Sequence, residues 1–133
     1  MLEDRLPAQS DRKKPGRLFD DDQTLPKLYE KFILGYFQRT HPRLQPRSEF
    51  LDWTLDDNAG HSLLPVMHPD VTLKDAAGRM LILDAKFYDQ ATVVRYEKTR
   101  LHSENLYQIF AYVKNAQASR NPALPAVSGM LLY

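Results

Sequence analysis

The chain of 133 residues contains no cysteine and no apolar run long enough to cross a membrane. Without cysteine the protein has no disulfide, no thiolate zinc ligand and no cysteine nucleophile. A membrane helix needs roughly 18 consecutive apolar residues, and the first twenty residues also lack the apolar core of a signal peptide. We therefore expect a cytoplasmic protein without a membrane segment.

The chain also lacks an excess of charge of one sign, because 18 Lys and Arg residues balance 17 Asp and Glu residues. Any contact with DNA must then depend on local basic clusters rather than on a global positive field. Two clusters can either contact phosphates or remain solvated. The first contains Arg39, Arg43 and Arg47, and the second contains Arg95, Lys98 and Arg100.

The remaining pattern indicates one folded domain. Residues 1–22 mix charge with proline and show no period, which predicts a loosely ordered arm before a domain over 23–133. Helical spacing of apolar residues predicts helices over 25–37 and 103–117. Aliphatic runs predict four strands, over 49–55, 66–74, 79–87 and 127–133. The order helix, three strands, helix, strand predicts an α/β fold with a central mixed sheet flanked by helices.

A turn sequence at 75–78 predicts that the second and third of these strands form an antiparallel hairpin. If the turn is symmetric about Ala77, Asp70 lies opposite Asp84. Side chains alternate along a strand, so Lys86 shares the face of Asp84. Two carboxylates and one ammonium group are therefore expected on a single patch.

Two facing carboxylates repel each other, and a divalent metal relieves that repulsion. Mg²⁺, or Mn²⁺ in its place, prefers oxygen ligands and takes one or two protein carboxylates. Asp70 and Asp84 fit this role, and the carbonyl of Ala85 can add a ligand. Lys86 can then position water or neutralise charge on a phosphodiester. The alternative is an ordinary ion pair between Lys86 and one of the carboxylates.

A Pro-Asp pair at the start of one strand and Asp-Ala-Lys at the end of the next resemble the motif of the PD-(D/E)XK nuclease superfamily. Across about residues 19–133 the likeness is closer. The segments LPKLYEKFILGYF, LLPVMHPDVTL, MLILDAKFY, HSENLYQIFAYV and GMLLY are similar, in this order, to the nuclease domain of the McrC family. McrC proteins are the cleavage subunits of McrBC 5-methylcytosine-specific restriction systems.

The resemblance implies that Asp70 and Asp84 are metal ligands and that Lys86 is the catalytic lysine. It also suggests that Glu30, on the first helix, completes the acidic site as a catalytic residue and metal ligand. The alternative for Glu30 is a side chain that faces water. Family members carry a Gln-x-x-x-Tyr signature that lines the site, and Gln108 with Tyr112 matches it.

In the second helix Asn105, Gln108 and Tyr112 share a face by their spacing of three and four residues. We expect Gln108 in the catalytic site, with Asn105 and Tyr112 toward DNA. The alternative is a hydrogen-bonded pair that supports the hairpin. Four histidines match no zinc spacing. One of them, His68, is expected to be an ordinary strand-end residue, with contact to the site as the alternative.

The resemblance implies a Mg²⁺-dependent endonuclease that hydrolyses double-stranded DNA as a restriction component against modified foreign DNA. Family members are longer, and their N-terminal portion engages McrB, a GTP-driven ring motor. We expect a nuclease module truncated relative to the family, with the motor-docking region absent. The alternative is a non-catalytic remnant that binds DNA or a partner protein. The intact residues Asp70, Asp84, Lys86 and Gln108 favour the enzyme, whereas the truncation favours the remnant.

Overall fold

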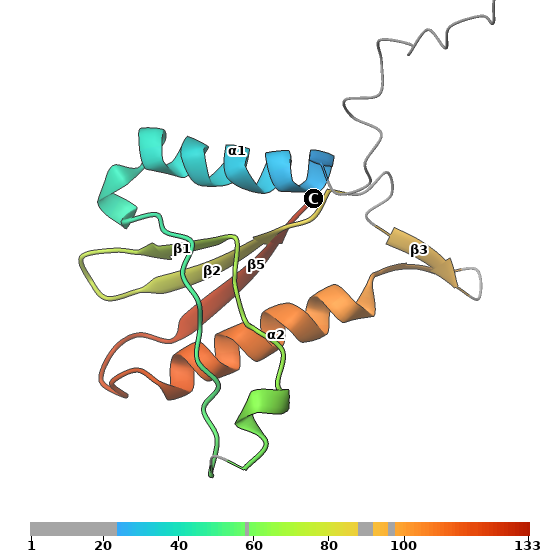
Figure 1. The fold of residues 1–133 in the computed structure, drawn as a ribbon. Helices are drawn as coiled ribbons and strands as arrows, with labels where there is room; N and C mark the ends of the chain where they lie inside the picture. The colour runs from blue at the N-terminus through green and yellow to red at the C-terminus, as the bar shows by residue number, and fades with distance from the viewer. Residues whose placement is uncertain (1–23, 58, 88–91, 96–97) are drawn as a thin grey trace, which may run out of the picture.

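A computed structural model describes residues 24–57, 59–87, 92–95 and 98–133, with the side chains of 92–101 excepted. The predicted arm over 1–22 lies outside the described residues. Figure 1 shows a small sheet between two helices. The helices and strands are α1 (Thr24–Thr40), β1 (Val71–Lys74), β2 (Met80–Ala85), β3 (Thr92–Arg95), β4 (Lys98–Leu101), α2 (Ser103–Ala118) and β5 (Val127–Leu132). Two short 3₁₀ turns cover Pro42–Leu44 and His61–Leu63.

The main sheet has three strands in the order β1-β2-β5. β1 and β2 pair antiparallel with Thr72 opposite Ile82, which confirms the predicted register of the hairpin. β5 runs parallel to β2 after the crossover through α2, and a separate two-stranded sheet joins β3 to β4. The predicted α/β class, with a mixed sheet flanked by helices, is confirmed.

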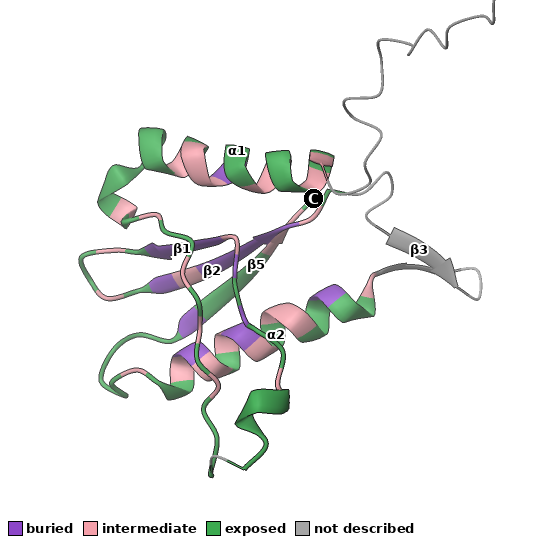
Figure 2. Ribbon diagram, viewed as in Figure 1, coloured by how far each residue is buried: buried purple, intermediate pink, exposed green. Residues whose placement is uncertain are grey.

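Strand alternation divides the core into two layers, one on each face of the sheet. Ile82 packs against α2, whereas Leu83 and Ala85 pack toward α1. β2 is therefore covered on both faces, which explains why its sequence MLILDA shows no polar alternation. Figure 2 shows the buried residues concentrated along β1 and β2, between the two helices.

One strand prediction is wrong, and one hairpin was not predicted. Residues 49–55 form no strand, and the chain near them makes only the isolated bridges Arg47–Thr72 and Leu51–Met67. The facing segment contains Pro65 and Pro69, which have no N–H to donate, so a continuous ladder cannot form there. The hairpin of β3 and β4 was not predicted, because its strands carry charged residues and lack a long aliphatic run.

Among the helices that the structure describes, none is both long and apolar enough to cross a membrane. α1 extends three residues beyond its predicted end and stops before Pro42. Its apolar residues are not all buried, since Leu28 is 55% exposed and Phe32 is 63% exposed. Ile33 is the buried residue of this helix and packs on the sheet.

Close packing of α2 on β5 requires glycine at position 129. A Cβ atom there would lie 2.8 Å from carbons of both Ile109 and Val113. We expect Gly129→Ala to lower the free energy of unfolding by about 1–3 kcal/mol, because overpacking forces side chains and backbone to shift. Urea denaturation measures this change. Gly35→Ala is the matched control, since a Cβ at Gly35 in α1 meets no atom within 4 Å and the substitution should not destabilise.

Candidate active site

β2 delivers Asp84 and Lys86 to one face of the sheet, beyond the apolar layer that faces α2. Asp84 is 3% exposed, and its Oδ2 lies 2.5 Å from Lys86 Nζ. The backbone N–H of Lys86 donates to Leu132 O at 2.7 Å, so the chain remains paired with β5 at this point. The extended backbone thus keeps Lys86 on the same face as Asp84, as the sequence predicted.

Asp70 is held at the start of the hairpin by a backbone donor from the opposite strand. Its Oδ2 accepts a hydrogen bond of 2.7 Å from the N–H of Ala85, and the preceding Pro69 is fully buried. In an antiparallel pair the N–H and C=O of one residue point to the same side. The carbonyl of Ala85 therefore faces the side on which Asp70 lies, where the sequence placed a third oxygen ligand.

The electrostatic environment of Asp70 disfavours its charged form. Burial, followed by the negative charges of Asp84 and Glu30, raises the pKa of Asp70 to about 7. The hydrogen bond from Ala85 N–H and the charge of Lys86 act in the opposite direction but do not compensate. A cation bound beside Asp70 would therefore stabilise its charged form, because a nearby positive charge favours the carboxylate.

Glu30 approaches this site from α1. The residue is half-buried, and it is near enough for its charge to act on the Asp70 carboxyl. No direct contact joins the two side chains in the part of the chain that the structure describes. The structure therefore places Glu30 beside the acidic pair, and its role as a ligand stays a prediction.

α2 contributes a hydrogen-bonded chain that holds the lysine. Lys86 Nζ donates to Gln108 Oε1 at 2.7 Å, and Gln108 Nε2 donates to Tyr112 OH at 2.9 Å. Tyr112 is 5% exposed, and burial together with the charge of Asp84 raises its pKa although Gln108 and the backbone of His68 lower it. Gln108 thus contacts the site directly, whereas Tyr112 supports Gln108 from the interior.

The other residues expected to bind DNA lie on α2 and on the β3–β4 hairpin. Asn105 is 5% exposed, and its Nδ2 donates to Tyr133 OH at 3.4 Å, which favours a role in joining α2 to the end of β5. The backbones of Arg95, Lys98 and Arg100 lie in the β3–β4 hairpin. Their side chains lie outside the described part of the structure, so their contacts with DNA remain predictions.

Sequence reasoning missed Ser48 and Phe50, which contact His68 and Pro69 just before Asp70 in the chain. Ser48 Oγ lies 2.9 Å from His68 Nε2 and donates to the carbonyl of Pro69 at 3.2 Å, while the ring of Phe50 stacks on His68. Ser48 and Pro69 are 21 positions apart, and neither carries a recognisable motif. No local signal in the sequence indicates this contact.

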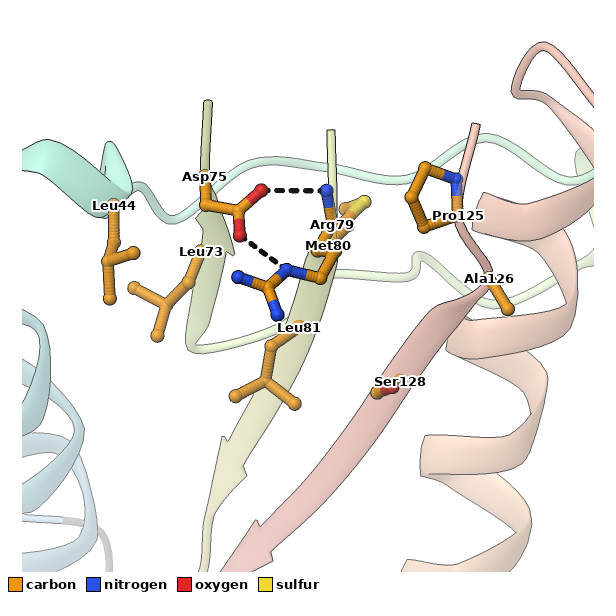
Figure 3. Close-up of a pocket in the computed structure, with 9 residues that line it drawn as sticks. All are labelled: Leu44, Leu73, Asp75, Arg79, Met80, Leu81, Pro125, Ala126 and Ser128. Atoms are coloured by element: carbon orange, nitrogen blue, oxygen red, sulfur yellow. Dashed lines mark hydrogen bonds and ion pairs between the residues drawn. The ribbon is translucent and has the colours of Figure 1, made fainter. Parts of the chain in front are cut away.

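A cavity of about 350 Å³ lies at the turn end of the hairpin, at the opposite end of β2 from Asp84. Figure 3 shows its apolar lining, which includes Leu73 and Leu81, and the ion pair between Asp75 and Arg79. Asp75 Oδ2 lies 2.6 Å from Arg79 Nε, so the two charged groups satisfy each other. This cavity is separate from the carboxylate pair.

The residues around Asp70 and Asp84 fit a hard divalent cation that needs only one or two protein carboxylates as ligands. Within the described residues no group of three or more His, Cys, Asp or Glu side chains is positioned to hold a metal. Mg²⁺ commonly takes one or two protein carboxylates and fills its remaining positions with water and substrate oxygens. Asp84 Oδ2 is buried and makes no hydrogen bond among the residues that the structure describes, and Lys86 Nζ lies 2.5 Å from it as its ion-pair partner.

The mixed sheet, the two flanking helices and the site at the end of the hairpin are compatible with a nuclease-like α/β core. The chain belongs to the family of McrBC 5-methylcytosine restriction system components, whose model matches residues 1–133. It is similar to the type IV methyl-directed restriction enzyme EcoKMcrBC of Escherichia coli K12, with 26% identity over 138 residues. The match covers 100% of this chain and 38% of that relative, so the chain spans less than half the relative's length.

Proposed function

We propose that this domain is a Mg²⁺-dependent endonuclease that hydrolyses phosphodiester bonds of double-stranded DNA. The observation that supports the proposal is the acidic pair: the negative charge of Asp84 helps raise the pKa of Asp70, and Lys86 Nζ lies 2.5 Å from Asp84 Oδ2. Two carboxylates together disfavour each other's charge, and an apo protein gains no stability from that arrangement. Such an arrangement is typical of sites that hold a metal.

Asp70, Asp84 and the Ala85 carbonyl are the groups that would hold Mg²⁺, with Glu30 as a further ligand from α1. When bound, the ion would polarise the phosphodiester and lower the pKa of a bound water. The protein's own part is to set the charge and the position of these oxygens. The N–H of Ala85 fixes the orientation of the Asp70 carboxyl, and the β2 backbone fixes that of Asp84.

Lys86 supplies a fixed positive charge to the reacting phosphate. Its ammonium donates to Gln108, which in turn is held by buried Tyr112, so the side chain is pre-organised rather than freely rotating. A donor held in place before the substrate arrives stabilises charge that develops on a phosphoryl oxygen, since it does not have to reorganise. Lys86 also has the reach to orient an attacking water by hydrogen bonding.

Membership of the McrBC family supports a role in restriction of modified DNA. We infer that the domain acts as the cleavage module of such a system and works with a McrB-like GTP-driven motor subunit. The E. coli relative is described as a methyl-directed restriction enzyme, and the present chain matches 38% of it. Recognition of the methylated base and coupling to the motor are then tasks for other parts of the system.

A binding-only module is the competing function, and metal titration separates the two. Isothermal calorimetry with Mg²⁺ should show binding by the wild-type protein and an affinity lowered more than about 10-fold in Asp70→Asn, because the variant removes a negatively charged ligand. Asp75→Asn is the matched control, since Asp75 lies at the hairpin turn and pairs with Arg79. Equal Mg²⁺ binding by all three proteins would contradict the assigned site.

A further inference from the structure

Phe50 presents an aromatic ring to solvent and stacks on His68, which precedes Asp70 by two residues. The side chain is 69% exposed, and its ring stacks on the His68 imidazole with a centroid distance of 4.2 Å and an interplanar angle of 17°. One face of the ring is therefore held by a planar partner while most of its surface remains in water. This pair of stacked rings, Phe50 and His68, is called the aromatic platform below.

Ser48 fixes the orientation of the platform. A carbonyl oxygen can only accept, so the single hydroxyl proton of Ser48 goes to Pro69 O, at 3.2 Å. His68 Nε2 lies 2.9 Å from the same hydroxyl oxygen, within hydrogen-bond distance. These contacts hold the imidazole beside Pro69, and the Phe50 ring stacks on it.

The platform is also fixed relative to the catalytic carboxylate. The Pro69 carbonyl belongs to the peptide that leads directly into Asp70, and the bridges Arg47–Thr72 and Leu51–Met67 enclose the platform on both sides. The backbone of His68 interacts with Tyr112, the residue that supports Gln108 and, through it, Lys86. The aromatic platform is therefore connected to Lys86 through hydrogen bonds of Tyr112 and Gln108.

We propose that the aromatic platform contacts a nucleotide next to the scissile phosphate and positions the DNA strand for cleavage. This inference rests on the proposed nuclease function. Two extended residues span at most roughly 7 Å, which is about the distance covered by two nucleotides of one duplex strand at 3.4 Å each. A strand that runs from Asp70 toward His68 would therefore place a nucleotide within about two steps of the scissile phosphate at the platform.

The chemistry of the platform selects an unstacked base. A flat, rigid aromatic surface stacks on any nucleobase, but a base inside an intact duplex offers no free face. Phe50 must therefore meet a base that is already single-stranded, or enter between two base pairs as a wedge. The platform predicts tighter binding where the duplex is locally opened, for example at a short gap.

The test is DNA binding in EDTA, where cleavage does not interfere. Fluorescence anisotropy compares an intact duplex with the same duplex that carries a short single-stranded gap. Phe50→Ala should weaken binding to the gapped DNA by about 5- to 150-fold, since one base–aromatic contact is worth about 1–3 kcal/mol. Phe50→Trp should retain the affinity. Phe32→Ala is the matched control, because Phe32 is 63% exposed on α1, and it should change the affinity less than about twofold.

Several outcomes overturn the inference: wild-type protein that binds no DNA, Phe50→Ala that binds like wild type, or equal losses in the Phe50 and Phe32 variants. Unchanged DNA binding with loss of binding to a partner protein would assign Phe50 to a protein interface instead. If Lys86→Ala abolishes cleavage while Phe50→Ala binds gapped DNA like the wild type, the nuclease proposal is supported and the platform proposal is contradicted. If Phe50→Ala weakens DNA binding but the wild type shows no Mg²⁺-dependent cleavage, the platform proposal is supported and the nuclease proposal is contradicted.

Discussion

Replacing Lys86 with alanine is expected to lower kcat for Mg²⁺-dependent cleavage of plasmid DNA by about 10²–10⁴-fold, with a much smaller effect on KM. The ammonium group lies 2.5 Å from Asp84 Oδ2 and 2.7 Å from Gln108 Oε1, so its position is set before DNA binds. Loss of a pre-organised donor affects the transition state more than the ground state. Quantitative conversion of supercoiled to nicked and linear plasmid measures the effect.

Lys74→Ala is the control for this variant. Lys74 is an exposed lysine of the same hairpin, and it lies at the end of β1 away from Asp70. It should cleave like the wild type. Lys86→Ala also leaves the buried Asp84 carboxylate without its cationic neighbour, so thermal melting must show that the variant remains folded at the assay temperature. Folded Lys86→Ala protein that cleaves at the wild-type rate would exclude Lys86 from the reaction.

Asp70→Asn should make the metal-free protein more stable at pH 8, by about 1–2 kcal/mol after allowance for solvent screening of a partly exposed carboxyl. The pKa of Asp70 is about 7 in the folded protein, against an ordinary aspartate pKa of 3.8 in the unfolded chain. Between these values the native state holds a proton that the unfolded state has lost, so the stability of wild type falls as the pH rises from about 4 to 7. Asparagine carries no charge and still offers an oxygen to the Ala85 N–H.

Urea denaturation in EDTA at pH 4 and pH 8 checks this linkage. The two proteins should have similar stability near pH 4, where the wild-type carboxyl is protonated, and should diverge above pH 7. Saturating Mg²⁺ should then stabilise the wild type but not the variant, because a ligand that binds only the folded state shifts the equilibrium toward it. Asp70→Asn protein that is less stable than wild type at pH 8 would show that the carboxylate stabilises the fold instead.

The acidic hairpin was predictable because its geometry depends only on a turn and on strand parity. A turn centred on Ala77 determines the pairing of Thr72 with Ile82, and that register brings Asp70 to the N–H of Ala85. No long-range information is needed for this result. The Gln108–Tyr112 pair could be recognised for a similar reason, since residues four apart lie on one face of a helix.

Features that depend on long-range packing could not be read from the sequence. Leu28 and Phe32 belong to the helically spaced apolar residues of α1, yet both are more than half exposed because the small sheet covers only part of that helix. The same pattern could not decide whether Glu30 faces water or the acidic pair. The contact of Ser48 with Pro69 arises only when a loop crosses the start of β1, so no periodicity indicates it.

The central claim is that Asp70, Asp84 and Lys86 form a metal-dependent nuclease site, and plasmid cleavage by wild type and Asp84→Asn protein tests it most directly. We predict that wild type nicks supercoiled plasmid with Mg²⁺ and not in EDTA. Asp84→Asn should be slower by about 10³-fold, because the charge stabilisation supplied through this carboxylate is worth several kcal/mol. Cleavage that persists in EDTA, or equal cleavage by the two proteins, would contradict the account.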